Sequence, residues 1–110
     1  MAEIIPVQLH HEMEVIVENV SLVLDEYSLA CRKHPKFCDR MTDAPLLYWR
    51  RVEKEMKLRN SHPPFCADNI LMEEVGEALN AFLNEDKQHA KQELAQCAAV
   101  ILRMMAEIDK

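Results

Sequence analysis

The stretch NILMEEVGEALNAFLNEDKQHAKQELAQCAAVILRMM, residues 69–105, decides the fold of this 110-residue chain. Apolar residues recur at steps of three and four on both sides of a short polar link, residues 84–87, which is the period of an α-helix. So short a link favours two antiparallel helices that fold back as a hairpin. The expected apolar stripes are Leu71, Val75, Ala78, Leu79 and Phe82 on the first helix, and Leu94, Cys97, Ala98, Ile101, Leu102 and Met105 on the second.

The composition of the whole chain extends this helical interpretation. The chain has one glycine and 49% apolar residues, and its periodic runs are long, which favours an all-α protein over a sheet. We expect a single domain over residues 1–110, built as a compact bundle of about four helices. Thr42 or Asp43 is expected to cap the second helix. The expected helices are residues 8–32, 44–59, 66–84 and 88–108.

The first helix carries an unbroken apolar stripe and is expected to supply most of the buried support. Val15, Leu22 and Val23 widen this stripe beyond what one partner helix needs. They are either a subunit interface or part of the ring around a small core, and the sequence leaves both open. On the second helix, the residues expected to point inward are Leu46, Trp49, Val52 and Met56.

Acidic residues border the stripes of the hairpin. Glu73, Glu74 and Glu77 lie within about one helical turn, and Glu93 and Gln96 lie one turn apart on the partner helix. Antiparallel pairing can bring the two groups face to face, where carboxylates without a counter-charge would repel one another. A hard divalent cation removes that difficulty, and oxygen donors suit Mg²⁺ or Mn²⁺. The alternative is a solvated acidic face near a helix N-terminus.

The pattern Glu73-Glu74-x-x-Glu77, fifteen residues, then Glu93-x-x-Gln96 resembles the EExxE and ExxD signature of the MazG-like all-α nucleoside triphosphate pyrophosphohydrolases. The resemblance covers roughly residues 65–109. It is closest to short phage and bacterial MazG-like proteins with a polar residue other than Asp at the last position. Gln96 is the departure, because a neutral amide is a weaker ligand for magnesium than a carboxylate.

The resemblance implies an all-α bundle, usually a homodimer or larger homo-oligomer such as a tetramer, that uses magnesium to cleave a nucleoside triphosphate into the monophosphate and pyrophosphate. It implies metal-binding roles for Glu73, Glu74, Glu77, Glu93 and Gln96, with Glu73 or Glu74 as the catalytic base. The alternative is a catalytically inactive helical module that binds nucleotides or proteins, in which Gln96 marks the loss of chemistry.

The charge of −6 is unevenly placed along the chain. Residues 32–59 carry +5, whereas residues 1–31 carry −6 and residues 60–110 carry −5. An acidic chain argues against non-specific binding to duplex nucleic acid, whereas a local basic segment suits a triphosphate. Candidate substrate-binding residues are Lys54 and Lys57 in this segment, and His62 and Asn69 in or beside the following loop. A solvated helix face is the commoner cause of such a run of basic residues and is favoured here.

The sequence shows no sign of a membrane or secreted protein. No apolar run approaches the roughly 18 residues of a membrane span, and no secretory signal is evident, so we expect a cytoplasmic protein.

A zinc site receives little support from the sequence. Cys31, His34 and Cys38, with His62 or Cys66, are spaced like zinc ligands, but no second close pair completes a standard site. Reduced cysteines are the simpler expectation, with Cys31 and Cys97 as small core residues.

Overall fold

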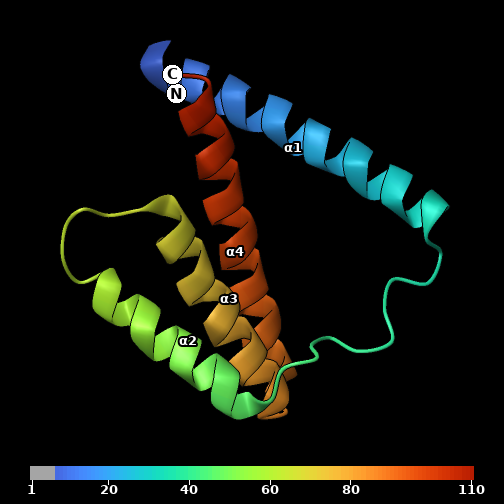
Figure 1. Cartoon of the computed structure of the whole chain (residues 1–110). Coiled ribbons are helices and arrows are strands. Elements are labelled where there is room, and N and C mark those ends of the chain that lie inside the picture. Colours follow the sequence, from blue (N-terminus) through green and yellow to red (C-terminus); the bar gives the residue numbers. More distant parts are fainter. Residues whose placement is uncertain (1–6) are drawn as a thin grey trace, which may run out of the picture. The chain divides into compact units, whose positions relative to one another are not determined.

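The structure is a computed structural model that describes the backbone of residues 7–110 and the side chains of residues 11–110. Over these residues the chain forms four helices and no strand (Figure 1). The helices are α1 (Val7–Lys33), α2 (Leu46–Arg59), α3 (Ala67–Leu83) and α4 (Lys87–Ile108). The prediction of an all-α protein with about four helices is confirmed, and each predicted end lies within two residues of the observed one.

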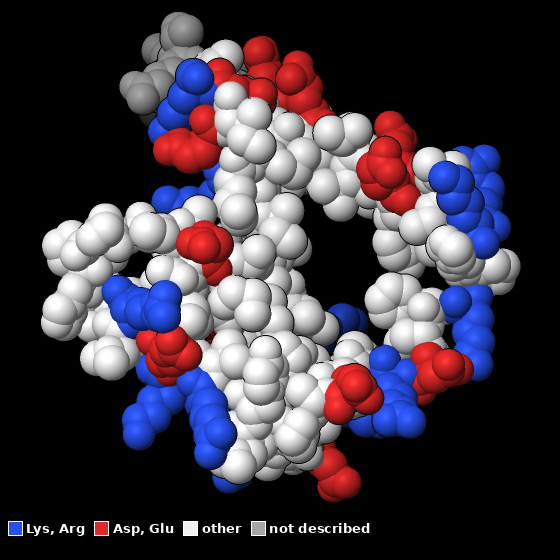
Figure 2. All heavy atoms as spheres, viewed as in Figure 1, with Lys and Arg blue, Asp and Glu red and all other residues white. Residues whose placement is uncertain are grey.

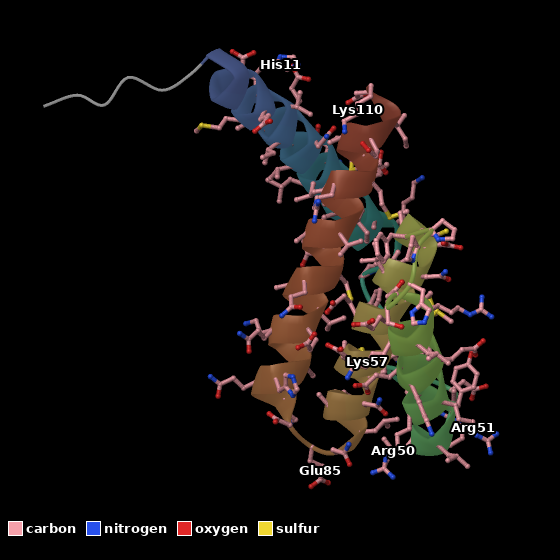
Figure 3. All side chains as sticks on the ribbon, turned by 90° about the vertical axis from the view of Figure 1, so that its left-hand side faces the viewer. His11, Arg50, Arg51, Lys57, Glu85 and Lys110 are labelled. Atoms are coloured by element: carbon pink, nitrogen blue, oxygen red, sulfur yellow. The ribbon has the colours of Figure 1, made fainter. Side chains whose placement is uncertain are left out.

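The chain divides into two compact units. Residues 39–104, which contain α2, α3 and most of α4, form one unit, and the described residues before 39, together with residues 105–110, form the other. In the first of these, α3 and α4 run antiparallel as the predicted hairpin, with α2 beside α3 (Figures 1 and 3). The buried apolar side chains of the described residues are all small, namely Ala78, Ala81, Ala90 and Cys97.

The close approach of α2 to α3 depends on Gly76. A Cβ atom at Gly76 would lie 3.1 Å from the backbone nitrogen of Glu53 and 3.3 Å from its Cα atom, so α2 leaves too little room for a side chain at this position. Glycine inside a helix costs about 1 kcal/mol relative to alanine, and this close packing offsets that cost. Four residues of α2 were predicted to point inward. The prediction is confirmed, since all four are half-buried: Leu46, Trp49, Val52 and Met56.

The start of α2 differs from the prediction. Its N-cap is Pro45, without a side-chain hydrogen bond, so neither Thr42 nor Asp43 caps the helix. The hydroxyl oxygen of Thr42 instead accepts hydrogen bonds from the Ala44 N–H (3.1 Å) and from the Trp49 indole N–H (2.9 Å). Because Thr42 lies three residues before the N-cap, its side chain serves the indole rather than the helix end.

A tight turn joins α3 to α4. The Glu85 N–H donates to the Phe82 carbonyl (3.0 Å) and the Asp86 N–H donates to the Ala81 carbonyl (2.9 Å), which is the Schellman pattern. Glu85 has a φ of 62°, the left-handed conformation for which glycine is usual. The Asp86 carboxylate then accepts the His89 N–H (3.1 Å) and so caps α4.

The expectation that α1 supplies most of the buried support is wrong. None of its described side chains is buried, and Cys31, expected in the core, is exposed. Leu94 and Ile101, placed by the sequence on an inward stripe of α4, are exposed as well. The buried side of α4 instead runs through Ala90, Glu93 and Cys97, which recur at steps of three and four, and Leu94 and Ile101 lie outside it. Among the described helices, none has both the length and the apolar character needed to cross a membrane.

Candidate functional site

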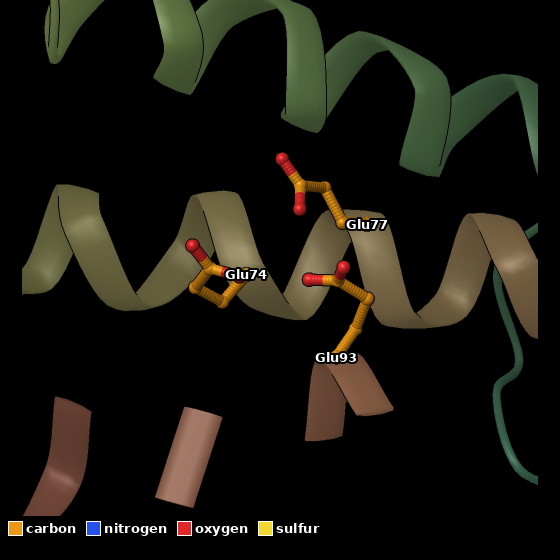
Figure 4. A group of neighbouring side chains, drawn as sticks. All are labelled: Glu74, Glu77 and Glu93. Atoms are coloured by element: carbon orange, nitrogen blue, oxygen red, sulfur yellow. The ribbon is translucent and has the colours of Figure 1, made fainter. Parts of the chain in front are cut away.

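Three carboxylates meet between α3 and α4. Glu74 and Glu77 lie one turn apart on α3, and Glu93 faces them from α4, so that oxygen atoms from all three lie within 4.8 Å of one another (Figure 4). The spacing of three residues on α3 and the antiparallel hairpin produce this arrangement. Among the described residues, no other group of three or more His, Cys, Asp or Glu side chains comes together in this way.

The carboxylates are shielded from water and perturb each other. Burial, followed by a hydrogen bond with Glu93 and by the negative charge of its neighbours, raises the pKa of Glu74 to about 7. Burial and the same kinds of contact raise the pKa of Glu77 to about 7. Burial also tends to raise the pKa of Glu93, but hydrogen bonds with Glu77, Glu74 and His89 outweigh it, and the net shift is downward. The cluster therefore retains protons at neutral pH.

The donor set fits a hard cation. Glu93 is only 6% exposed, yet its Oε2 atom has no hydrogen-bond partner, and the buried Oε2 atom of Glu74 is also without one. Buried carboxylate oxygens without partners are costly, and bound protons or a cation relieve that cost. Oxygen-only donors of this kind match magnesium or manganese rather than a soft metal.

His89 is a member of the site that the sequence analysis missed. Its Nε2 atom lies 3.1 Å from Glu93 Oε1, and its Nδ1 atom lies 3.8 Å from Asp86 Oδ2. The imidazole thus lies between the residue that caps α4 and the most buried carboxylate of the cluster. The four-residue spacing of His89 and Glu93 on one helix is a signal that could have identified this pair.

A lysine from α2 reaches the cluster from the other side. The Lys57 Nζ atom lies 2.8 Å from Glu53 Oε1 and 3.7 Å from Glu77 Oε1. The hydrogen bond with Glu53 raises the pKa of Lys57, although partial desolvation opposes the shift. In Figure 3, Lys57 lies on the side of α2 turned toward α3, whereas Arg51 projects from the opposite side. Lys57 therefore links the two acidic side chains across the α2–α3 contact.

Asn80 fixes the position of Glu53. Its side chain is 8% exposed, and its Nδ2 atom donates hydrogen bonds to the Glu53 carboxylate and to the Trp49 carbonyl (3.2 Å). The sequence pattern identifies neither Asn80 nor Glu53 as a site residue, because the two lie 27 residues apart in the chain and on different helices. The hydrogen bond from Asn80 holds the Glu53 carboxylate beside Lys57.

A cavity of about 410 Å³ opens beside the cluster. Glu77 is shared between the two, so a molecule in the cavity would lie against the carboxylates. Lys57 and His89 supply donors to its wall, and α2, α3 and the start of α4 all contribute. Its lining residues are Glu53, Lys57, Glu77, Asn80, Ala81, Asn84, Asp86 and His89.

The remaining predicted site residues lie apart from the three carboxylates. Glu73 Oε1 accepts a hydrogen bond from Asn60 Nδ2 (3.0 Å), which turns it toward the end of α2. Gln96 and Lys54 are exposed. His62 and Asn69 help to line a second cavity of about 430 Å³, whose other residues are Leu58, Arg59, Pro63, Pro64 and Cys66.

The cysteines do not gather around a metal site. Cys31, Cys38 and Cys66 are free and exposed, and within residues 11–110 no thiol belongs to a potential metal-binding group of three. Cys97 is buried as expected. Burial raises the pKa of its thiol, as do the charges of Glu74, Glu93 and Glu77, so this side chain is uncharged.

A scan against protein-family models, a search of curated proteins and a search of solved structures found no match to the chain.

Proposed function

We propose that the chain hydrolyses a nucleoside or deoxynucleoside triphosphate to the monophosphate and pyrophosphate with the help of Mg²⁺ or Mn²⁺. One observation carries the proposal: Glu74, Glu77 and Glu93 converge beside a cavity that also presents Lys57 and His89. A bound triphosphate needs a cation and basic hydrogen-bond donors. The carboxylates offer ligands for the cation, and Lys57 and His89 supply the donors.

Glu74, Glu77 and Glu93 would hold the cation, with the exposed Gln96 as a weaker outer donor. The unpaired Oε2 atoms of Glu74 and Glu93 support this assignment, because they are oxygen donors without competing partners. When bound, the cation supplies Lewis acidity toward phosphate oxygens and lowers the pKa of a coordinated water.

The side chains around the cluster take the other roles. Glu73, held by Asn60 outside the three converging carboxylates, accepts the proton of the attacking water; Glu74 is the alternative base. The water oxygen forms a bond to the α-phosphorus, the bond from that phosphorus to the bridging oxygen breaks, and pyrophosphate leaves. Lys57 neutralises charge on the phosphates, since it lies 3.7 Å from Glu77 at the cavity wall.

The other proposed features follow from the same reaction. Nucleoside triphosphates are abundant in the cytoplasm, which is where we place the protein. His62 and Asn69 line the second cavity and are our candidates for contacts to the base or sugar. Neither duplex nucleic acid nor a membrane is proposed as a partner, whereas assembly as a homodimer or homotetramer is.

Pyrophosphate release from a panel of canonical and modified nucleoside triphosphates, with Mg²⁺ or Mn²⁺, tests the proposal. Wild-type protein should release pyrophosphate, and Glu77→Gln should abolish release while leaving the helical circular dichroism unchanged. Glu107→Gln is the matched control, because Glu107 is exposed on α4 and pairs only with Lys110 among the described residues. Nucleotide binding without turnover by the wild type would instead support the inactive binding module.

A further inference from the structure

A lysine ammonium group lies between carboxylates of two helices at the edge of the candidate cation site. The Lys57 Nζ atom is 2.8 Å from Glu53 Oε1 on α2 and 3.7 Å from Glu77 Oε1 on α3. Glu77 also belongs to the cluster with Glu74 and Glu93. In Figure 4 its side chain extends from α3 toward α2, whereas Glu93 approaches from α4. Glu77 therefore stands between the proposed divalent cation and a positive charge that the chain itself supplies.

This contact differs from an ordinary ion pair on a helix surface. Figure 2 shows basic side chains over α2 next to acidic ones, and the pair of Arg59 and Glu55 is of that kind, with both side chains 56% exposed. Such a pair contributes little beyond its own helix. Glu53, in contrast, is only 24% exposed, and Lys57 reaches from it to a second helix. One positive charge is thus held where acidic side chains of α2 and α3 meet.

Both oxygens of the Glu53 carboxylate are engaged. Oε1 accepts a hydrogen bond from Lys57 Nζ, and Oε2 accepts one from Asn80 Nδ2. Asn80 is 8% exposed and also donates to the Trp49 carbonyl (3.2 Å), so its amide group is fixed in place. A metal ion would have to displace one of these donors before Glu53 could coordinate it.

The α4 side of the cluster is the opposite case. The Oε2 atoms of Glu74 and Glu93 are buried and have no hydrogen-bond partner. Such oxygens gain from binding a cation, because their burial is otherwise uncompensated. The site is therefore divided into a place that suits a divalent cation, beside Glu93, and a place that an ammonium group already fills, beside Glu53.

An ammonium group can do part of the work of a metal ion. Hydrolytic sites with two metal ions hold them roughly 3.5–4 Å apart, so that both stabilise charge on the same phosphoryl group. Lysine is a compact point charge that also binds phosphate. The hydrogen bond with Glu53 raises the pKa of Lys57 and the charges of Glu77 and Glu73 add to the shift, although partial desolvation opposes it. Lys57 therefore remains a cation at neutral pH.

We propose that the Lys57 ammonium group takes the place of a second metal ion, so that the site binds a single divalent cation and Glu77 is shared between that cation and Lys57. The inference rests on the proposed cation site and deepens the proposed function by fixing the number of ions. A bound triphosphate would meet one divalent cation and one fixed positive charge. Removal of the ammonium group would free Glu53 Oε1 and Glu77 Oε1 to bind a second cation.

Isothermal titration calorimetry of the full-length chain with Mn²⁺ alone counts the bound ions, and electron paramagnetic resonance of free Mn²⁺ gives an independent count. Wild-type protein should bind one Mn²⁺ per chain. Lys57→Met should bind two, because methionine fills similar space without a charge and leaves two carboxylates to a second ion. Lys57→Arg keeps the positive charge and should bind one.

Lys54→Met is the matched control, since Lys54 is exposed on the same helix but does not line the cavity. This variant should bind one ion. The double variant Lys57→Met, Glu53→Gln should also return to one ion, because the glutamine keeps an acceptor for Asn80 but removes the charge that the second ion needs. Far-UV circular dichroism checks that each variant retains the helices of the wild type.

The outcomes separate this inference from the proposed function. Two ions in the wild type, or one ion in Lys57→Met, would overturn the inference and leave the proposed cation site intact. A wild type that binds no Mn²⁺ would overturn the cation site, and the inference with it. A second ion in Lys54→Met, or one that persists in the double variant, would overturn the inference too, because that ion would not lie between Glu53 and Glu77.

Discussion

The backbone nitrogen of Glu53 lies 3.1 Å from the place that a Cβ atom at Gly76 would occupy, which is closer than an ordinary van der Waals contact. The two nearest atoms belong to the backbone of α2 and not to a flexible side-chain end, so a side chain at Gly76 would push on the helix itself. This contact limits how closely α2 and α3 can approach each other. It also sets how far Lys57 and Glu53 stand from Glu77.

Replacing Gly76 with valine should therefore separate the two helices. We expect the free energy of unfolding to fall by roughly 2–3 kcal/mol, because overpacking against a backbone exceeds any gain in helix propensity. Urea denaturation followed by circular dichroism measures the loss. Ala95→Val, at an exposed position of α4, is the control and should cost well under 1 kcal/mol. Equal losses in both variants would show that the contact is unimportant.

The carboxylate cluster should make stability fall as pH rises in the absence of divalent cations. Glu74 and Glu77 have a pKa of about 7 in the folded protein, compared with 4.5 for an ordinary glutamate, so the folded state binds more protons between these values. We expect a loss on the order of 1–3 kcal/mol between pH 5 and pH 8. The lowered pKa of Glu93 makes stability fall as the pH decreases, but this effect occurs below pH 4.5 and so outside the range from pH 5 to pH 8.

Urea denaturation from pH 5 to pH 8 with a chelator measures this dependence. Glu77→Gln should flatten the profile, since it removes one of the two shifted groups. Adding Mg²⁺ or Mn²⁺ at pH 8 should restore stability to the wild type and have little effect on the variant. A wild-type profile that rises over this range would contradict the proposed protonation of the cluster.

His89 should strengthen cation binding by holding Glu93. Its Nε2 atom lies 3.1 Å from Glu93 Oε1, the kind of contact that orients a ligand without touching the metal. We expect His89→Ala to weaken Mn²⁺ binding about tenfold, as measured by isothermal titration calorimetry. His34→Ala, which alters an exposed histidine outside the site, should leave affinity unchanged. Full affinity in His89→Ala would exclude this role.

The turn between α3 and α4 should be improved by glycine. Glu85 adopts a left-handed φ of 62°, which is strained for a residue with a Cβ atom. We expect Glu85→Gly to raise the free energy of unfolding by about 0.5–1 kcal/mol, as measured by thermal and urea denaturation. Asn84→Gly serves as the control: Asn84 has a φ of −87° and its side chain donates to the Asn80 carbonyl, so this change should destabilise instead.

Helix boundaries and the convergence of Glu74, Glu77 and Glu93 were predictable, because each depends on spacing within a helix or across one short hairpin. Glu53 and Asn80 were not, because the contact that brings them together joins separate helices and depends on the missing side chain of Gly76. Periodicity identifies which side of a helix is apolar, but not what covers that side. For that reason the exposure of Leu24 on α1 and of Ile101 on α4 was unexpected.

The basic segment on α2 was interpreted either as a phosphate-binding surface or as a solvated helix face. Lys57 and Lys54 differ in position in a way that separates these two interpretations. Both lysines are exposed, but Lys57 lines the cavity and contacts Glu53 and Glu77, whereas Lys54 does not line the cavity. If the proposed reaction takes place, Lys57→Met should reduce kcat/KM for the nucleotide by about 10- to 100-fold, which is a loss of roughly 1.4–2.8 kcal/mol of transition-state stabilisation.

The measurement for these lysines is steady-state pyrophosphate release over a range of nucleotide and Mg²⁺ concentrations. Lys54→Met removes the same charge one turn away and should retain activity within about twofold, because a solvated lysine contributes little to a neighbouring site. Since Lys57 also neutralises Glu77, its loss should raise the nucleotide KM without weakening Mn²⁺ binding. If Lys54→Met lost as much activity as Lys57→Met, the phosphates would be attracted by the overall positive charge of α2 and not by a specific contact with the Lys57 ammonium group.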